Sequence, residues 1–309
     1  MARFGGHVPR TEEQEADLRQ LLQQVQELQP LPAVALRLIA MADDGRFSAE
    51  NLADTVRVDP ALTLRVLRLA NSPFFGLPRR VTSLREGVVL LGFREVRALA
   101  LSACVLDPAV RGALDRAGID YDAFWINSVV VGFFAQALAM ADTMDRDQAF
   151  TAGLVHNIGR LALAQHRSDA LRAAAAEARA TGAHIHEIEE RDLGYTDAEV
   201  GAAIADSWGF PVPLVEAIAN HGRSIYEVRD PRSLETMVVK ARRFARSHGV
   251  ADGLDQLGVI PVADIEWHAP AIERALGRLG GAQGILDRAQ AYVRGDSGVE
   301  GASPRLQTA

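Results

Sequence analysis

Residues 59–76 read DPALTLRVLRLANSPFFG, which predicts a capped helix followed by an aromatic turn. Proline is favoured at the first position of a helix, where its missing N–H leaves no hydrogen bond unmade, so we expect the helix to start at Asp59-Pro60. Asn71 tolerates left-handed geometry and Pro73 cannot continue a helix, so the helix should end there. The apolar residues of the run recur at helical spacing and predict one buried face; they are Leu62, Val66 and Leu69.

The same spacing of apolar residues recurs along most of the chain and predicts an all-α fold. We expect an N-terminal helical subdomain over 11–118 and a second helical bundle over 119–294, with disordered termini at 1–10 and 295–309. Helices are predicted near 12–28, 33–42, 48–56, 60–70, 88–91, 93–106, 121–141, 146–155, 159–166, 169–180, 184–192, 196–208, 212–221, 234–248, 270–279 and 285–294, with a short one starting at Asp107-Pro108.

Composition and charge narrow the class of protein. The 309-residue chain carries a formal net charge of −7 at pH 7, which gives no general attraction to nucleic acid or anionic lipid, so neither is an expected partner. Its single cysteine, Cys104, can form no disulfide within the chain, as is typical of a reducing cytoplasm. The N-terminus has no apolar signal core, so we expect a cytoplasmic protein that is neither secreted nor membrane-spanning.

The run 59–76 resembles the signature of the HDOD family. Further pieces of the family pattern follow in order over about residues 20–250: Leu31-Pro32-Ala33-Val34, Ser83-Leu84, Leu91-Gly92 and AGLVHNIGRL at 152–161. The resemblance implies a helical N-terminal subdomain packed on a bundle related to the HD-superfamily metal-dependent phosphohydrolases. It also implies a role in bacterial signalling through contacts with other signalling proteins, and it leaves self-association open.

The resemblance also places the positions at which HD-superfamily hydrolases bind metal. The adjacent His-Asp pair of that superfamily is His156-Asn157 here, and a neutral amide is a poor partner for a transition metal. We therefore expect a vestigial site that has lost its carboxylate charge, with no catalytic residue, no cofactor and no metal. The positions that correspond to this site are Asn127, His156, Asn157, Asp197, Asn220, His221 and Arg242.

Several interpretations of this site stay open. His156, Asn157 and Asn127 are expected to form a structural hydrogen-bonded cluster, because buried polar groups need partners. Arg242 would instead favour a small anion such as a nucleotide, which makes the chain a sensor that does not hydrolyse its ligand. A metal-dependent phosphohydrolase or phosphodiesterase is the remaining alternative to the non-catalytic regulatory module that we favour.

Two further features need an interpretation. Phe74 and Phe75 lie in a turn that polar residues would serve as well, so they have either a packing role or a role in contacting another protein. His184 and His186 are two residues apart, and on one helix they would point in different directions. We therefore do not expect these two histidines to share a metal.

Overall fold

The computed structural model describes residues 10–26, 33–41, 47–58, 60–77, 81–105, 110–253 and 269–294, and all regular elements in these ranges are helical. The predicted all-α class is confirmed. The helices are α1 (Glu12–Gln26), α2 (Ala33–Ala40), α3 (Ala49–Arg57), α4 (Pro60–Ala70), η1 (Pro73–Phe75), α5 (Leu84–Leu91), α6 (Phe93–Val105), α7 (Arg111–Arg116), α8 (Tyr121–Ala141), α9 (Arg146–Val155), α10 (Ile158–His166), α11 (Ser168–Thr181), α12 (Ile185–Leu193), α13 (Asp197–Ser207), α14 (Val212–Asn220), α15 (Leu234–Ser247), α16 (Pro270–Arg278) and α17 (Gly281–Arg294).

Polar caps explain where several helices begin. The Ser83 hydroxyl accepts a hydrogen bond from the backbone N–H of Glu86 at 3.2 Å and so starts α5. The Glu86 carboxylate accepts in return from the N–H of Thr82 at 2.9 Å, so the pair resembles a capping box whose return bond is shifted by one residue. The predicted starts at Asp59 and at Asp107-Pro108 lie outside the described residues.

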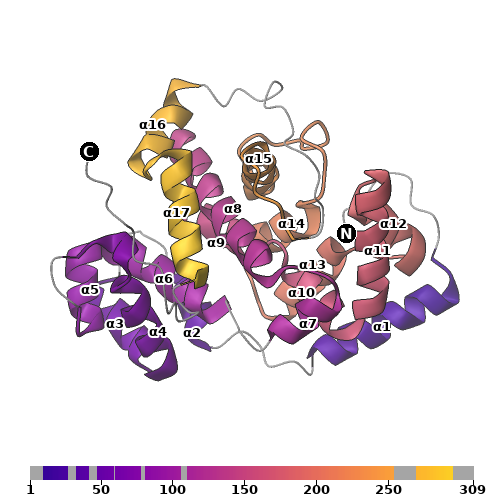
Figure 1. Cartoon of the computed structure of the whole chain (residues 1–309), viewed down its shortest axis with the longest axis horizontal. Helices are drawn as coiled ribbons and strands as arrows, with labels where there is room; N and C mark the ends of the chain where they lie inside the picture. Colours follow the sequence, from indigo (N-terminus) through magenta and orange to yellow (C-terminus); the bar gives the residue numbers. More distant parts are fainter. Residues whose placement is uncertain are drawn as a thin grey trace, which may run out of the picture.

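Helices α2 to α6 form one body, seen at the lower left of Figure 1, in which α2 and α4 pack on α6 and α3 packs on α5. Arg97 of α6 is buried and ties this body together, since its Nε donates to the Leu38 carbonyl of α2 at 2.7 Å. The same guanidinium lies 3.8 Å from the Asp147 carboxylate of α9. A buried ion pair therefore joins the α2–α6 body to the rest of the protein.

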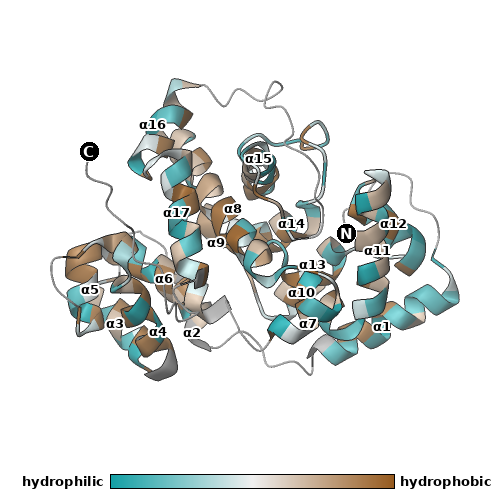
Figure 2. Cartoon of the chain, viewed as in Figure 1, coloured by the Kyte–Doolittle hydropathy of each residue, from teal (hydrophilic) through white to brown (hydrophobic). Residues whose placement is uncertain are grey.

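Helix α8 is the central element of the remaining helices. Helices α9, α15, α16 and α17 pack around it, and its ribbon is mostly on the hydrophobic side of the scale in Figure 2. It is long and apolar enough to cross a membrane, yet most of its apolar stretch is buried inside this protein. The apolar composition of α8 is therefore explained by its position in the core of the fold.

Helices α1 and α7 pack on the second bundle and not on the α2–α6 body. Leu21 of α1 and Leu114 of α7 share a core with Trp125 of α8, and Figure 1 shows α1 beneath α10 and α11. Asp17 of α1 pairs with Arg167 at 2.7 Å, which holds the helix there. The predicted subdomain over 11–118 thus does not coincide with a packing unit, because an amphipathic stripe does not say which partner covers it.

The chain termini are described only in part. Arg10, the last residue of the segment predicted to be disordered, donates from its Nε to the Gly194 carbonyl at 2.5 Å and pairs with Glu199. The predicted disorder at 1–9 and at 295–309 lies outside the described residues.

The aromatic pair lies in η1, where Phe74 and Phe75 contact each other edge to face with 5.0 Å between ring centroids. Both are half-buried, and η1 packs against α17, whose Arg288 guanidinium lies 5.8 Å from the Phe74 ring centroid. Gly76 follows with a φ of +53°, a backbone conformation that glycine adopts without strain. The contacts support a packing role for the pair.

Candidate functional site

Close helix packing brings the predicted site positions together. A Cβ on Gly159 at the start of α10 would lie 1.9 Å from the Asp197 carbonyl oxygen, so only glycine lets α10 and α13 approach this closely. Gly153 does the same between α9 and α8, where a Cβ would lie 2.6 Å from the Gly132 Cα. His156 follows α9 directly and therefore lies near the middle of the bundle.

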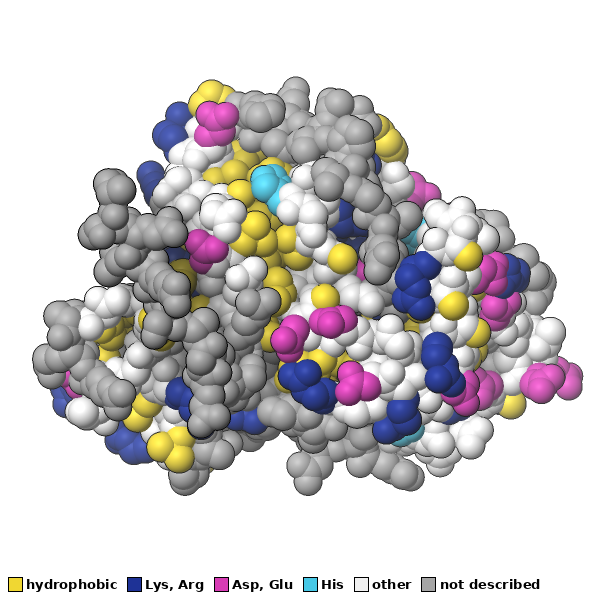
Figure 3. All heavy atoms as spheres, viewed as in Figure 1, with side chains coloured by type: hydrophobic (Ala, Val, Ile, Leu, Met, Phe, Trp, Pro, Cys, Tyr) yellow, Lys and Arg dark blue, Asp and Glu magenta, His cyan; other side chains and the backbone are white. Residues whose placement is uncertain are grey.

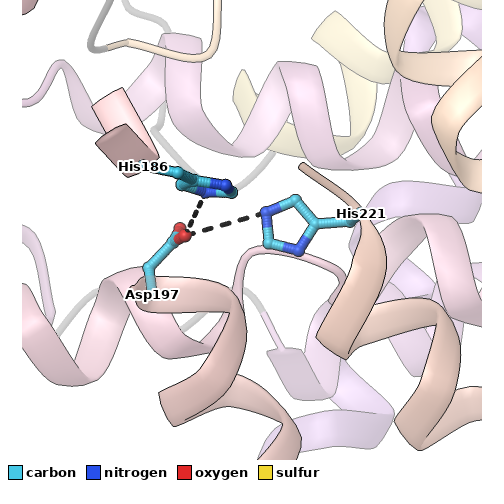
Figure 4. A group of neighbouring side chains, drawn as sticks. All are labelled: His186, Asp197 and His221. Atoms are coloured by element: carbon cyan, nitrogen blue, oxygen red, sulfur yellow. Dashed lines mark ion pairs between the residues drawn. The ribbon is translucent and has the colours of Figure 1, made fainter. Parts of the chain in front are cut away.

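Asp197, the first residue of α13, lies at the centre of the site and is fully buried. Its Oδ1 lies 2.5 Å from His186 Nε2 and 3.8 Å from His221 Nε2, as Figure 4 shows. Its Oδ2 lies 2.9 Å from Arg160 Nε, and the Arg160 Nη1 also reaches Asp252 Oδ2 at 3.1 Å. One carboxylate thus faces histidines on one side and a buried guanidinium on the other.

Two imidazoles are held in one tautomer by the backbone. His156 Nδ1 donates to the Gly153 carbonyl at 2.6 Å, and His221 Nδ1 donates to the Ile218 carbonyl at 2.8 Å. A carbonyl oxygen can only accept, so each Nδ1 carries the proton and each neutral ring has its lone pair on Nε2. Both Nε2 atoms are buried and have no hydrogen-bond partner among the described residues. The two rings lie 5.2 Å apart between centroids.

Burial and neighbouring charges set the protonation states. Burial, with Arg242 nearby, lowers the pKa of His156 to about 3, and the same two causes hold the pKa of His221 well below its usual value. Burial opposes ionisation of Asp197, but Arg160 and His186 outweigh it and keep the pKa of this carboxyl low. Burial and the charge of Asp197 raise the pKa of Glu189 well above its usual value. The site therefore combines the neutral imidazoles of His156 and His221 with the buried carboxylate of Asp197, and Asp252 lies on the far side of Arg160.

The expected structural cluster of His156, Asn157 and Asn127 is not formed. Asn127 Nδ2 donates to the Val250 carbonyl at 3.4 Å, and the side chain of Asn157 has no hydrogen-bond partner within the described part of the chain. His156 bonds instead to the backbone of its own helix, which leaves the three side chains without bonds to one another. This prediction is wrong: the local carbonyl of Gly153 holds His156, and the more distant carbonyl of Val250 holds Asn127.

The expectation that the site has lost its carboxylate charge is also wrong. Asp197 is among the predicted positions, but the sequence analysis did not predict Glu189, which is buried against Asp197, or Asp252, which pairs with Arg160. Glu189 Oε2 accepts from the backbone N–H of Asp197 at 2.9 Å. The sequence does contain a pattern that could have predicted Glu189. His186 and Glu189 are three residues apart, so they lie on the same face of α12.

His184 and His186 were not expected to share a metal with each other, and the group of possible metal ligands contains His186 but not His184. His184 precedes α12 and caps it, its Nδ1 accepting from the N–H of His186 at 3.3 Å. The partners of His186 come instead from α13 and from the residue after α14, namely Asp197 and His221. Arg160 lies four residues after His156, within the motif at 152–161, and was not predicted as a site residue.

The two remaining predicted positions lie at the edge of the site. Arg242 of α15 donates from Nη1 to the His221 carbonyl at 2.5 Å. Asn220 is buried, and its Nδ2 lies at 3.5 Å from the Glu235 carboxylate. Both side chains therefore face polar partners supplied by α15 or by the end of α14.

The donor atoms of His186, Asp197 and His221 lie within 4.8 Å of one another and could hold a metal ion. Imidazole nitrogen and carboxylate oxygen suit divalent ions such as Zn²⁺, Fe²⁺ or Ni²⁺. An ion at this point would polarise a bound water or stabilise the junction of three helices.

The buried histidines predict a pH-dependent stability. In a chelator-containing buffer, the free energy of unfolding should fall as the pH falls from 6.5 to 4.5, by about 1.4 kcal/mol per pH unit for each net proton that unfolding takes up. The unfolded chain protonates its histidines near 6.5, whereas folded His156 resists protonation down to about 3, so the unfolded state binds more protons in this window.

His184 and His221 act in the same direction as His156, since their pKa values are also lowered. Glu189 acts in the opposite direction, because its raised pKa keeps it protonated only in the folded state. The pKa of His166 is also lowered, and those of Glu235 and Asp147 are also raised, but the histidines begin to titrate in the unfolded chain at the top of this pH range, so we expect their effect to dominate. Urea unfolding at pH 6.5, 5.5 and 4.5 measures the effect, and a midpoint that stays constant or rises on acidification would contradict the assignment of buried neutral imidazoles.

Solved structures share this fold. An HDOD domain protein with unknown function from Geobacter sulfurreducens has a TM-score of 0.69 and 23% identity, over 92% of this chain and 98% of that one. A protein of Shewanella amazonensis SB2B, provisionally named a phosphohydrolase, has a TM-score of 0.62 and 28% identity, over 89% of this chain and 97% of that one. A provisionally named signal transduction protein of Marinobacter aquaeolei VT8 has a TM-score of 0.64 and 24% identity, over 92% of this chain and 64% of that one.

A curated relative from Treponema pallidum (strain Nichols), an uncharacterised protein, is 26% identical over 204 residues. The match covers 64% of this chain but only 38% of that protein's length. The family model described as the HDOD domain matches residues 28–224, which confirms the resemblance seen in the sequence. Since that match spans well over half of the chain, this protein belongs to the HDOD domain family.

Proposed function

We propose that this chain is a regulatory HDOD module that acts through contacts with other signalling proteins and does not hydrolyse phosphoesters. The observation that carries the proposal is the buried guanidinium of Arg160, which occupies the centre of the site. It is fully buried and pairs with both Asp197 and Asp252. The carboxylates of Asp197 and Asp252 thus already share a fixed cation of the protein.

Charge balance argues against the two-metal chemistry of the HD superfamily. Asp197 and Asp252 supply two negative charges, and Arg160 and the neighbouring Arg242 supply two positive ones. Two divalent ions would bring four more positive charges without carboxylates to balance them. Asn157, which stands at the position of the aspartate in the His-Asp pair, supplies no charge and no basic oxygen.

The alternatives have weaker support. A phosphohydrolase is suggested by the provisional name of the Shewanella amazonensis protein, which is 28% identical. A sensor of small anions would need a free cation, but Arg242 donates to the His221 carbonyl. Nucleic acid also remains an unexpected partner, since acidic and basic side chains are interspersed on the face shown in Figure 3.

Hydrolysis assays test the proposal directly. The purified chain, supplied with Mn²⁺ or Mg²⁺, should release no product above buffer from cyclic dinucleotides, nucleoside triphosphates or bis-p-nitrophenyl phosphate, because it has no charge-balanced two-metal centre. An active HD-superfamily phosphohydrolase assayed in parallel is the positive control. Metal-dependent turnover that disappears in His156→Ala would overturn the proposal.

A further inference from the structure

We propose that His186, Asp197 and His221 bind one divalent transition-metal ion. This site differs in composition from the one implied by the family resemblance, because His186 was not among those positions. The inference goes beyond the proposed function, since a single bound ion stabilises or senses without any need for hydrolysis.

The donor geometry suits one ion after a small adjustment. In a tetrahedral zinc site with bonds of about 2.0–2.1 Å, neighbouring donor atoms lie about 3.3 Å apart. Asp197 Oδ1 lies 2.5 Å from His186 Nε2 and 3.8 Å from His221 Nε2, so the present distances bracket that value. Since all three donors already lie within 4.8 Å of one another, small side-chain movements would bring them to such distances.

The lone pairs already point inward. His221 and His156 each donate their Nδ1 proton to a carbonyl of their own helix, which is the arrangement that typically orients a metal-binding histidine. The Nε2 atoms of His156 and His221 are buried without a hydrogen-bond partner among the described residues, whereas His186 Nε2 lies 2.5 Å from Asp197 Oδ1. A buried polar atom without a partner is unfavourable, and an ion at this point would give His221 Nε2 a partner while also binding His186 and Asp197.

Asp197 is oriented by its neighbours in the same way. Arg160 Nε approaches Oδ2 at 2.9 Å, and the backbone N–H of the residue donates to Glu189 at 2.9 Å. These contacts leave Oδ1 facing the imidazoles, as Figure 4 shows. Arg160 thus fixes the orientation of the Asp197 carboxylate through Oδ2, and Oδ1 stays available to bind a cation.

Gly222 supplies an independent observation. A Cβ at this position would lie 1.9 Å from His186 Nδ1 and 2.1 Å from its Cε1, so the imidazole packs directly on the glycine backbone. Gly222 follows His221, and its lack of a side chain lets ligands from α12 and from the end of α14 converge. Gly222→Ala should displace His186 while leaving the helices in place.

Cobalt binding followed by visible absorption tests the site. The full chain is treated with chelator and titrated with Co²⁺, then with competing Zn²⁺, and the bound metal is counted by mass spectrometry. About one ion per chain is expected, with the intense visible bands typical of four-coordinate Co²⁺. His186→Ala, which removes a ligand atom, and Asp197→Asn, which replaces a charged oxygen ligand by a neutral amide oxygen, should each weaken binding by on the order of 100-fold.

His248→Ala is the matched control, because His248 is an exposed histidine that contacts Phe244 and Phe134. It should bind Co²⁺ as the wild type does, whereas Gly222→Ala, which keeps every ligand, should bind more weakly. If His186→Ala does not fold, zinc-edge X-ray absorption of the wild type replaces it, with imidazole scattering expected.

The proposal would be overturned if the wild type did not bind metal stoichiometrically, or if its X-ray absorption showed no imidazole scattering. It would also be overturned if His186→Ala and His248→Ala bound Co²⁺ with equal affinity. The measurement contains no substrate, so a negative result leaves the non-hydrolytic function standing. Conversely, turnover in the hydrolysis assay would overturn that function and leave the count of bound metal unchanged.

Discussion

Gly159→Ala should lower the free energy of unfolding by at least about 3 kcal/mol, measured by urea denaturation at neutral pH. The new Cβ would lie 1.9 Å from the Asp197 carbonyl oxygen and 2.5 Å from the Gly201 backbone nitrogen. Both are backbone atoms of α13, so no side chain can rotate to make room. Helices α10 and α13 would have to move apart, which would also separate Arg160 from Asp197.

Gly277→Ala in α16 is the matched control for this substitution. Gly277 has nothing within 4 Å of an added Cβ, and alanine favours the helix by about 0.5–1 kcal/mol over glycine. The control should therefore be neutral or slightly stabilising. A similar loss in both variants would show that steric contact with α13 is not the cause.

Arg160→Met should lower the free energy of unfolding by about 3–5 kcal/mol, because it leaves two buried carboxylates without their shared guanidinium. Asp197 is 0% exposed and Asp252 is 7% exposed, so water cannot replace the arginine. Methionine keeps much of the volume, which separates the loss of charge from the loss of packing. The same denaturation experiment measures the effect.

Arg57→Met is the control for the charge effect. Arg57 pairs with Asp54 at 2.7 Å, but the two side chains are 63% and 58% exposed, and such pairs are worth about 0–1 kcal/mol. A loss of less than about 1 kcal/mol is therefore expected there. If Arg160→Met proved equally mild, the buried ion pair would not be the element that neutralises the site.

Local sequence signals predicted the helices well, because caps and apolar spacing act within a few residues. The long helix α8 was predicted over 121–141 and is observed as Tyr121–Ala141, with the Asp120 carboxylate accepting from the N–H of Ala123. The family pattern also brought His156, Asp197 and His221 into one site, which the structure shows.

Long-range contacts account for what could not be predicted. Arg160 finds Asp252 across 92 positions of the sequence, and no local pattern announces that pairing. His186 was judged against its neighbour His184, although its partners lie on other helices. Likewise, the stripe on α1 predicts a buried face but does not identify α10 and α13 as the helices that cover it.

The packing of α1 and α7 on the second bundle makes the α2–α6 body an insertion that is anchored at both of its ends. Cutting one connection would leave it attached by the other, so it cannot be released as a free domain. Helix α1 rests on α10 and α13, the helices that carry Arg160 and Asp197. If a partner protein bound the inserted body and rotated it, the displacement would therefore be transmitted through the covalent chain and α1 to the helices that hold the Arg160–Asp197 ion pair.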